Sequence, residues 1–258
     1  MKRIFLLAIV LCLVFAGTAM AGELGIYPGY QVFNAGDQTG QGFFCKVRYL
    51  HDLTGPWSLG GFAYGFMGSG DMSDGGGYDY HEITFGPSLK HKADGWDAKA
   101  DIGALFSGSE DENGLYKNSQ DVIGGYGYGQ LSLYRNRNQG KRFLPETDVS
   151  VTLNLPFDTD AEESWDGKVF SEEELYDAQK VSVAVTSFLY DLPFGGDQRI
   201  SPFVRLGLEN QDGDTTYQAG GGLEVQVAED KKISFAYRHN FDSDYDRDVF
   251  QVFASLEF

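Results

Sequence analysis

Apolar and polar residues alternate along much of the chain, most regularly toward its C-terminus. The last residues place one set of apolar side chains on a single face of an extended strand: Phe250, Val252, Ala254, Leu256 and Phe258. Gln251 and Ser255 fall on the opposite face, and Phe253 is the exception. A period of two residues is typical of a strand with one apolar and one polar face. The same pattern recurs along most of the chain and predicts an all-β fold.

Short alternating runs are separated by Gly, Asn, Asp and Pro, which are typical of turns. The predicted strands are 24–33, 41–50, 57–67, 78–89, 96–106, 121–134, 144–155, 178–190, 200–209, 215–227, 231–239 and 247–258. Each is close to the ~9–11 residues that a tilted strand needs to cross a bilayer. The pattern therefore predicts an up-and-down antiparallel transmembrane β-barrel of about 12 strands, with 10 or 14 strands as alternatives.

Charged residues inside the predicted strands fall on the face opposite the apolar one. They are Lys46, Arg48, Glu82, Asp97, Lys99, Asp101, Asp148, Lys180, Arg205, Glu209, Glu224, Arg238 and Glu257. A basic side chain on the lipid face of a barrel costs ~2–4 kcal/mol at the bilayer midplane, so this segregation is expected if the apolar face contacts lipid. All but Glu257 are then predicted to line a pore. A soluble sandwich also alternates, with its apolar face inward, so alternation alone leaves both classes open.

The N-terminus favours export. Lys2 and Arg3 precede an apolar run, and Ala19-Met20-Ala21 is a small-x-small cleavage pattern. We expect residues 1–21 to be a cleaved signal peptide and residues 22–258 to form one barrel domain. After cleavage only Cys45 remains, so no disulfide can form within the mature chain. Closing a sheet into a barrel is one way for such a secreted chain to be stable without disulfides.

The formal net charge of −18 argues against nucleic acid as a partner, because phosphates would be repelled. With both ends of the barrel in the periplasm, most acidic residues fall in the connections that face outward, and basic residues gather in the periplasmic turns. The longest connection, 157–179, is on the outward side, as is typical of such barrels. Within it, Ser171-Glu172-Glu173-Glu174 predicts a short helical turn.

The C-terminal segment resembles a known family. Residues 250–258, which end on Phe258, resemble the targeting strand of Gram-negative outer-membrane β-barrels and porins. Residues 201–208, 219–225 and 233–239 are similar to the last hairpins of small barrels of this kind. The resemblance implies a location in the bacterial outer membrane and recognition of Phe250, Val252, Ala254, Leu256 and Phe258 by the barrel-assembly machinery.

No catalytic, cofactor or metal site is predicted. His239 lies near an outer rim, but Phe241 stands where a lipid deacylase pattern would have Ser. The aspartates of residues 242–248 alternate as at the start of a calcium loop, but the Gly and Glu of that motif are replaced by Arg247 and Phe253. No phosphate-cradling loop, zinc spacing or dinucleotide fingerprint occurs. We therefore do not expect an enzyme.

The mixed charges of the inner face favour a passive, porin-like diffusion channel for small polar solutes. The alternative is a structural or surface-interaction barrel whose acidic outer loops engage lipopolysaccharide or a partner through divalent cations. An outer-membrane lipid-modifying enzyme is the third hypothesis. In each case the expected surroundings are outer-membrane lipid and lipopolysaccharide.

Overall fold

The computed structural model describes residues 22–35, 38–72, 76–113, 116–134, 146–165, 168–173, 180–196, 198–211, 213–228, 230–241 and 245–257. Every regular element in these ranges is a β-strand. No helix within them is long and apolar enough to cross a membrane. The predicted signal peptide and the acidic positions Asp242 and Asp244 lie outside these ranges.

The strands are β1 Gly22–Ala35, β2 Gln38–Asp52, β3 Trp57–Met72, β4 Gly77–Ala93, β5 Trp96–Asn113, β6 Tyr116–Tyr134, β7 Glu146–Trp165, β8 Lys168–Glu173, β9 Lys180–Phe188, β10 Leu192–Gly195, β11 Gln198–Gln211, β12 Asp214–Ala228, β13 Lys231–Phe241 and β14 Tyr245–Glu257. Twelve of them form the wall of the molecule. The other two, β8 and β10, are short additions that pair with β7 and β11.

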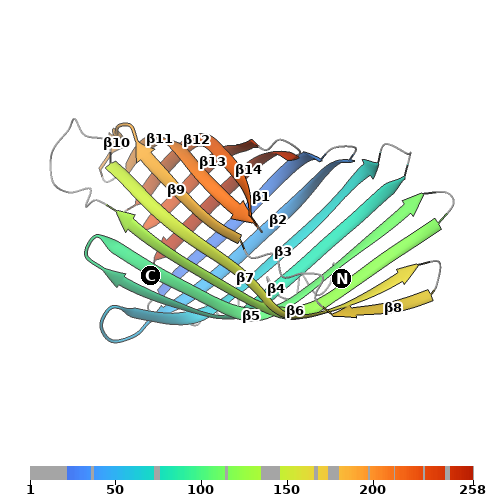
Figure 1. The fold of residues 1–258 in the computed structure, drawn as a ribbon. Helices are drawn as coiled ribbons and strands as arrows, with labels where there is room; N and C mark the ends of the chain where they lie inside the picture. The colour runs from blue at the N-terminus through green and yellow to red at the C-terminus, as the bar shows by residue number, and fades with distance from the viewer. Residues whose placement is uncertain are drawn as a thin grey trace.

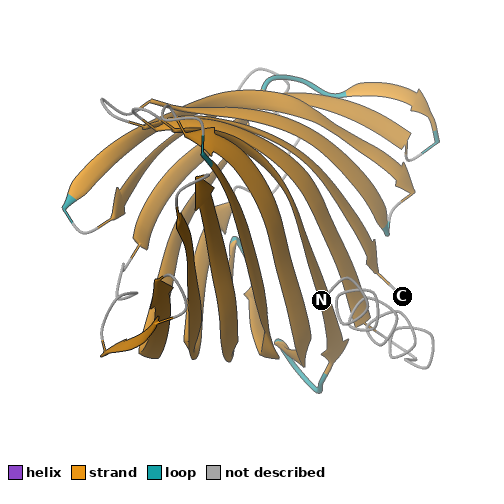
Figure 2. Cartoon of the chain, turned by 90° about the vertical axis from the view of Figure 1, so that its right-hand side faces the viewer, coloured by secondary structure: helices purple, strands orange, loops and turns teal. Residues whose placement is uncertain are grey.

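The sheet closes on itself (Figure 1). Each strand pairs with its neighbours in antiparallel fashion, β9 joins β7 to β11, and β14 pairs with β1. Closure removes the unpaired edges that an open sheet would expose to lipid, where no water satisfies backbone groups. Figure 2 shows the same wall from a second side. The predicted fold, a 12-stranded antiparallel barrel, is confirmed, and all twelve predicted strands have a counterpart.

The two ends of the barrel differ. At one end, here called the terminal end, β1 begins and β14 finishes, with Glu23 opposite Glu257. The tight turns 53–56 and 94–95 lie at the same end. At the other end, here called the loop end, long hairpins such as β5–β6 close, with Asn113 opposite Tyr116.

Strands run further toward the loop end than the sequence pattern predicted. β5 continues to Asn113 and β7 to Trp165, because hairpin partners supply backbone hydrogen bonds after the apolar alternation has ended. The helical turn expected from Ser171 is wrong for its described part, since Ser171 and Glu173 belong to β8, which pairs with the distal half of β7. This pairing supplies the backbone hydrogen bonds that a helix would have made internally.

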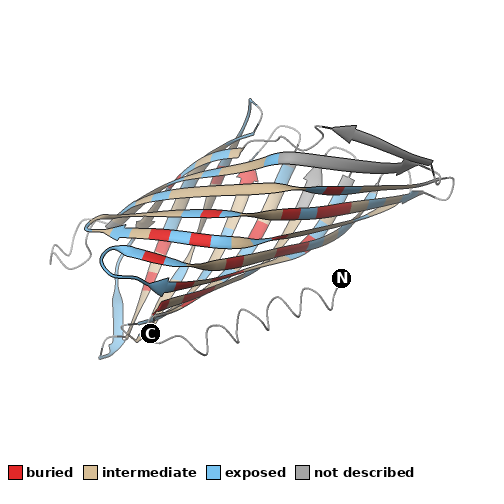
Figure 3. Ribbon diagram, turned by 90° about the horizontal axis from the view of Figure 1, so that it is seen from below, coloured by how far each residue is buried: buried red, intermediate tan, exposed pale blue. Residues whose placement is uncertain are grey.

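The faces of the wall are segregated by polarity. Large apolar side chains such as Leu206 (64% exposed) and Ile102 (62%) point outward. In β3 the pattern was ambiguous because both faces are apolar, and the structure resolves it: Phe62 is 4% exposed on the inner face and Leu59 48% on the outer. Buried and exposed residues alternate along the strands in Figure 3. The interior is therefore the polar and aromatic side of the sheet.

Candidate functional site in the barrel lumen

A cavity of about 1010 Å³ lies inside the barrel. Its lining includes Lys99, close to the terminal end of β5, and Gln211, at the loop end of β11. Of the residues predicted to line a pore, eight contribute to the cavity surface: Lys46, Arg48, Glu82, Lys99, Asp148, Lys180, Arg205 and Arg238. The remaining four, Asp97, Asp101, Glu209 and Glu224, are placed in the following paragraphs.

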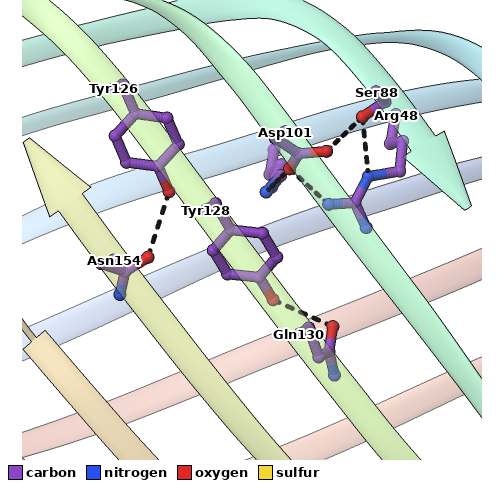
Figure 4. A network of polar contacts seen from close by, with 8 residues as sticks. Arg48, Ser88, Asp101, Tyr126, Tyr128, Gln130 and Asn154 are labelled. Carbon is purple, nitrogen blue, oxygen red and sulfur yellow. Dashed lines mark hydrogen bonds and ion pairs between the residues drawn. The ribbon is translucent and has the colours of Figure 1, made fainter.

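Asp101 is the centre of a buried ion-pair cluster built by β2, β4 and β5 (Figure 4). Lys46 Nζ lies 2.7 Å from Asp101 Oδ2, and Arg48 contacts the same oxygen. Ser88 donates its hydroxyl to the other oxygen of the carboxylate and accepts from Arg48 Nε at 3.3 Å. Asp101 is only 1% exposed. A buried charge has to be paired and hydrogen-bonded, and this carboxylate has both kinds of partner.

Tyrosines of β6 cover this cluster on the lumen side. The ring of Tyr128 lies 4.2 Å from Lys46 Nζ, within the range of a cation–π contact. The hydroxyl of Tyr128 donates to Gln130 at 2.9 Å, and that of Tyr126 donates to Asn154 of β7 at 3.2 Å (Figure 4). These hydrogen bonds hold both rings, so the aromatic part of the lining is fixed in place.

A second cluster lies nearer the loop end. Glu209 of β11 accepts from Lys180 of β9 at 3.2 Å and from Arg247 of β14 at 3.5 Å. Gln218 of β12 donates to the other carboxylate oxygen at 3.1 Å. As at Asp101, two bases share one acid. The second cluster therefore also leaves a surplus of positive charge beside the cavity.

Charges near the terminal end pair along the inner wall. Lys90 contacts Glu23, which ties β4 to β1. Asp97 lies 4.0 Å from Lys99. Glu224 of β12 is half-buried on the inner side of the sheet, opposite Ser201 and Ser234 in register.

Some inner charges among the described residues were not predicted to line the pore. Arg247, the first residue of the predicted strand 247–258, has the same parity as Gln251 and lines the cavity, because β14 begins two residues earlier, at Tyr245. Glu23 and Lys90 lie just beyond the predicted strand ends and form the pair described above. These two residues could have been predicted by extending the alternation of inward and outward side chains one or two positions beyond each predicted strand end.

A second hollow lies at the loop end, over the distal halves of β1 to β5. It encloses about 690 Å³ and is lined by Asp71, Asp79, Glu110 and Glu112 together with polar and glycine residues. We call it the acidic groove. The four acids have the same parity as outward-facing side chains of their strands, such as Leu59 of β3, Phe85 of β4 and Ile102 of β5, so the acidic groove lies on the outer face of the wall near the loop end.

His239 lies on the outer face of the wall. Its Nδ1 is 2.8 Å from an oxygen of Asp248, which also accepts from the hydroxyl of Tyr237 at 2.6 Å. Among the described residues no serine or cysteine is within hydrogen-bond distance of His239, so no nucleophile joins this pair there. Within the same ranges no group of three or more His, Cys, Asp or Glu side chains is placed to hold a metal ion.

Comparisons with known proteins identify the fold. No family model matches the chain, and no curated protein matches it. Among solved structures, the translocator domain of the autotransporter NalP from Neisseria meningitidis has a TM-score of 0.66 at 10% identity, over 99% of this chain and 96% of that chain. The β domain of the Bordetella autotransporter BrkA has a TM-score of 0.68 at 12% identity, over 92% of this chain and 100% of that chain.

The CymD monoaromatic hydrocarbon channel is also similar, with a TM-score of 0.52 at 7% identity, over 96% of this chain and 91% of that chain. At such low identities the likeness concerns the fold alone. The chain has the barrel fold of outer-membrane proteins, as the C-terminal resemblance implied.

Proposed function

We propose that the protein is an outer-membrane channel through which small polar solutes diffuse passively. The observation that carries this proposal is the cavity of about 1010 Å³, whose lining residues extend from Lys99 near the terminal end to Gln211 at the loop end. Twelve strands enclose more space than the eight-stranded barrels whose interiors are filled by side chains, and less than the 16–18 strands of open porins. A narrow, hydrated passage suits such a barrel.

The chemistry of the lining supports the same proposal. Charged and hydroxyl-bearing side chains from opposite walls, among them Lys46, Glu82 and Arg205, border the cavity. In a dry core so many charges would carry a large desolvation cost, whereas water in a passage hydrates those that are not fully paired. The outer face is apolar, as contact with lipid requires.

A structural or surface-interaction barrel is the second candidate, and the acidic groove favours it. Asp71, Asp79, Glu110 and Glu112 offer oxygen atoms that suit divalent cations bridging to anionic lipopolysaccharide. In this role the lumen need not conduct.

Conductance in a planar lipid bilayer separates the two candidates. The mature chain, from Gly22 to Phe258, is refolded in neutral detergent, its folding is verified by heat-modifiable migration on SDS gels, and it is added to one side of the bilayer. A channel gives discrete current steps in KCl. Folded protein that inserts without any current would contradict the channel and leave the structural barrel as the better account.

A further inference from the structure

Two arginines in the middle of the lumen differ from the other basic residues of the cavity lining because no acid among the described residues forms an ion pair with them. Arg205 and Arg238 both line the cavity. Within the part of the chain that the structure describes, neither has a carboxylate within 4.0 Å. The Nε atoms of both guanidinium groups are buried and donate to no acceptor there. A buried donor without an acceptor is unfavourable, so these groups favour a ligand that accepts hydrogen bonds.

The register of the sheet places the two arginines on either side of a glycine. Arg205 of β11 is opposite Gly220 of β12, and Gly220 is in turn opposite Arg238 of β13. Strands are ~4.8 Å apart, so the two Cα atoms are separated by roughly 10 Å across a position without a side chain. A Cβ on Gly220 would lie only 2.2 Å from the backbone oxygen of Tyr237, so the backbone restricts this position to glycine.

The charges around this gap are mostly positive. Seven described basic side chains line the cavity, namely Lys46, Arg48, Lys99, Lys180, Arg205, Arg238 and Arg247. The described acids on the same surface are Glu82 and Asp148. Asp101 and Glu209 each offset part of the charge of two bases behind that surface. Asp148 of β7 is in the same row as Arg205, two strands away, with Thr186 of β9 between them.

An apolar surface adjoins the two arginines on the side of the terminal end. Phe203 lies two residues before Arg205 on the same face of β11, and its ring is 5.6 Å from that of Phe188, centroid to centroid. Both rings line the cavity. The ring of Phe203 extends over Gly222, and both rings are largely buried where they border the cavity, with exposed fractions of 9% for Phe203 and 8% for Phe188. A ligand bound by the guanidinium groups can therefore rest its carbon skeleton on these rings.

We propose that Arg205, Gly220 and Arg238 form a binding site for the carboxylate of a small cyclic organic anion, whose ring packs against Phe203 and Phe188. This proposal rests on the channel function and specifies its substrate class. Guanidinium groups recognise carboxylates through paired, charge-assisted hydrogen bonds, which fits an anion seated across the glycine. The acids of the acidic groove lie on the outer face of the wall, and at physiological ionic strength charges are screened beyond about 8 Å, so the groove does not prevent entry.

The test uses benzoate as the probe, benzamide as its uncharged counterpart, and acetate as the carboxylate without a ring. For wild-type protein in a bilayer under a KCl gradient we expect an anion-selective reversal potential. Benzoate is expected to reduce the current in a saturable way at concentrations at least tenfold lower than acetate, and benzamide to have no effect.

Matched variants locate the site. Arg205→Gln and Lys99→Gln each remove one positive charge from the lumen, but only the first removes a ligand of the proposed site. Arg205→Gln and Arg238→Gln should each weaken the benzoate effect at least tenfold, while Lys99→Gln should leave it within about twofold. Arg205→Lys, which keeps the charge and loses the planar fork, should also weaken it. An equal effect of Lys99→Gln, a cation-selective wild type, or no response to benzoate would overturn the proposal.

Equilibrium binding of benzoate to the refolded protein in neutral detergent gives an independent readout. Binding that needs Arg205 and Arg238, in a protein that passes no current, would retain the site and contradict transport. Current without benzoate binding would retain the channel and contradict the site.

Discussion

The sharing of one buried acid by two bases is the main residue-scale feature of the lumen. Asp101 forms ion pairs with Lys46 and Arg48, and Glu209 forms ion pairs with Lys180 and Arg247. The acids are the more deeply placed members of these groups: the side chain of Asp101 is fully buried, whereas 18% of that of Lys46 is exposed. Each acid thus fixes the position of two basic side chains, and these basic side chains also line the cavity.

The first prediction concerns Asp101. Asp101→Asn keeps the hydrogen bond with Ser88 and removes the charge that Lys46 and Arg48 share, so two bases lose their counter-charge. Breaking a buried pair in this way is expected to lower the free energy of unfolding by about 3 kcal/mol. Urea titration of the refolded protein, followed by tryptophan fluorescence, measures the change. Glu112→Gln in the acidic groove is the control and should have little effect.

Sequence parity was sufficient to place the inner charges on one face, but not to pair them. Whether Lys46 meets Asp101 depends on β2 and β5 coming close along the same inner wall, although β3 and β4 lie between them. That proximity follows from the tilt and curvature of the whole barrel and leaves no local signal. The tyrosines of the lining were missed for another reason: Tyr64 and Tyr128 count as apolar in a hydropathy pattern, although their hydroxyls suit a wet interior.

At the scale of single elements, β14 combines two roles. Its residues 245–257 close the barrel against β1, and its outer face carries Phe250 and Val252, which are exposed to the surroundings. The predicted targeting residue Phe258 lies outside the described residues. The described register of β14 with β1 extends to Glu257, and we expect targeting and stability to be separable experimentally.

The second prediction separates them. Deleting Phe258 should strongly reduce the amount of folded protein recovered from outer membranes of expressing cells, because the chain would lack the terminal aromatic residue that the assembly machinery is expected to recognise. Refolding of the same purified variant into detergent should proceed as in the wild type, as judged by heat-modifiable migration. Phe258→Tyr, which keeps a terminal ring, is the control for the cellular measurement. Equal recovery of the deletion variant from cells would refute the targeting role.

For the molecule as a whole, the two ends of the barrel imply an orientation. The loop end carries long hairpins and the acidic groove, and the described turns 53–56 and 94–95 of the terminal end are tight. Outer-membrane barrels place long loops outside and short turns in the periplasm. We therefore expect the acidic groove to face the exterior of the cell and both ends of the mature chain to face the periplasm.

The third prediction tests this orientation with single cysteines in a Cys45→Ser background. A membrane-impermeant thiol reagent should label Glu112→Cys on intact cells, because this residue lines the acidic groove at the loop end. Asp230→Cys, in the turn at the terminal end, should react only after the cells are opened. Reversed labelling would invert the orientation, and equal labelling of both sites would contradict a membrane-spanning barrel.

The pairing of Glu23 with Glu257 makes the two ends of the described barrel neighbours within the wall. Geometrically the wall is a ring of hairpins in which the β1–β14 seam resembles every other contact between antiparallel strands. Strand pairing alone does not distinguish a first strand in this ring; the order of the strands is set only by the covalent connections between them. A circular permutant that joins the ends by a short linker and opens between β7 and β8 would keep every barrel contact, yet would no longer finish on the strand that ends at Phe258. We therefore expect folding information to be distributed around the ring, and delivery information to depend on which strand ends the chain.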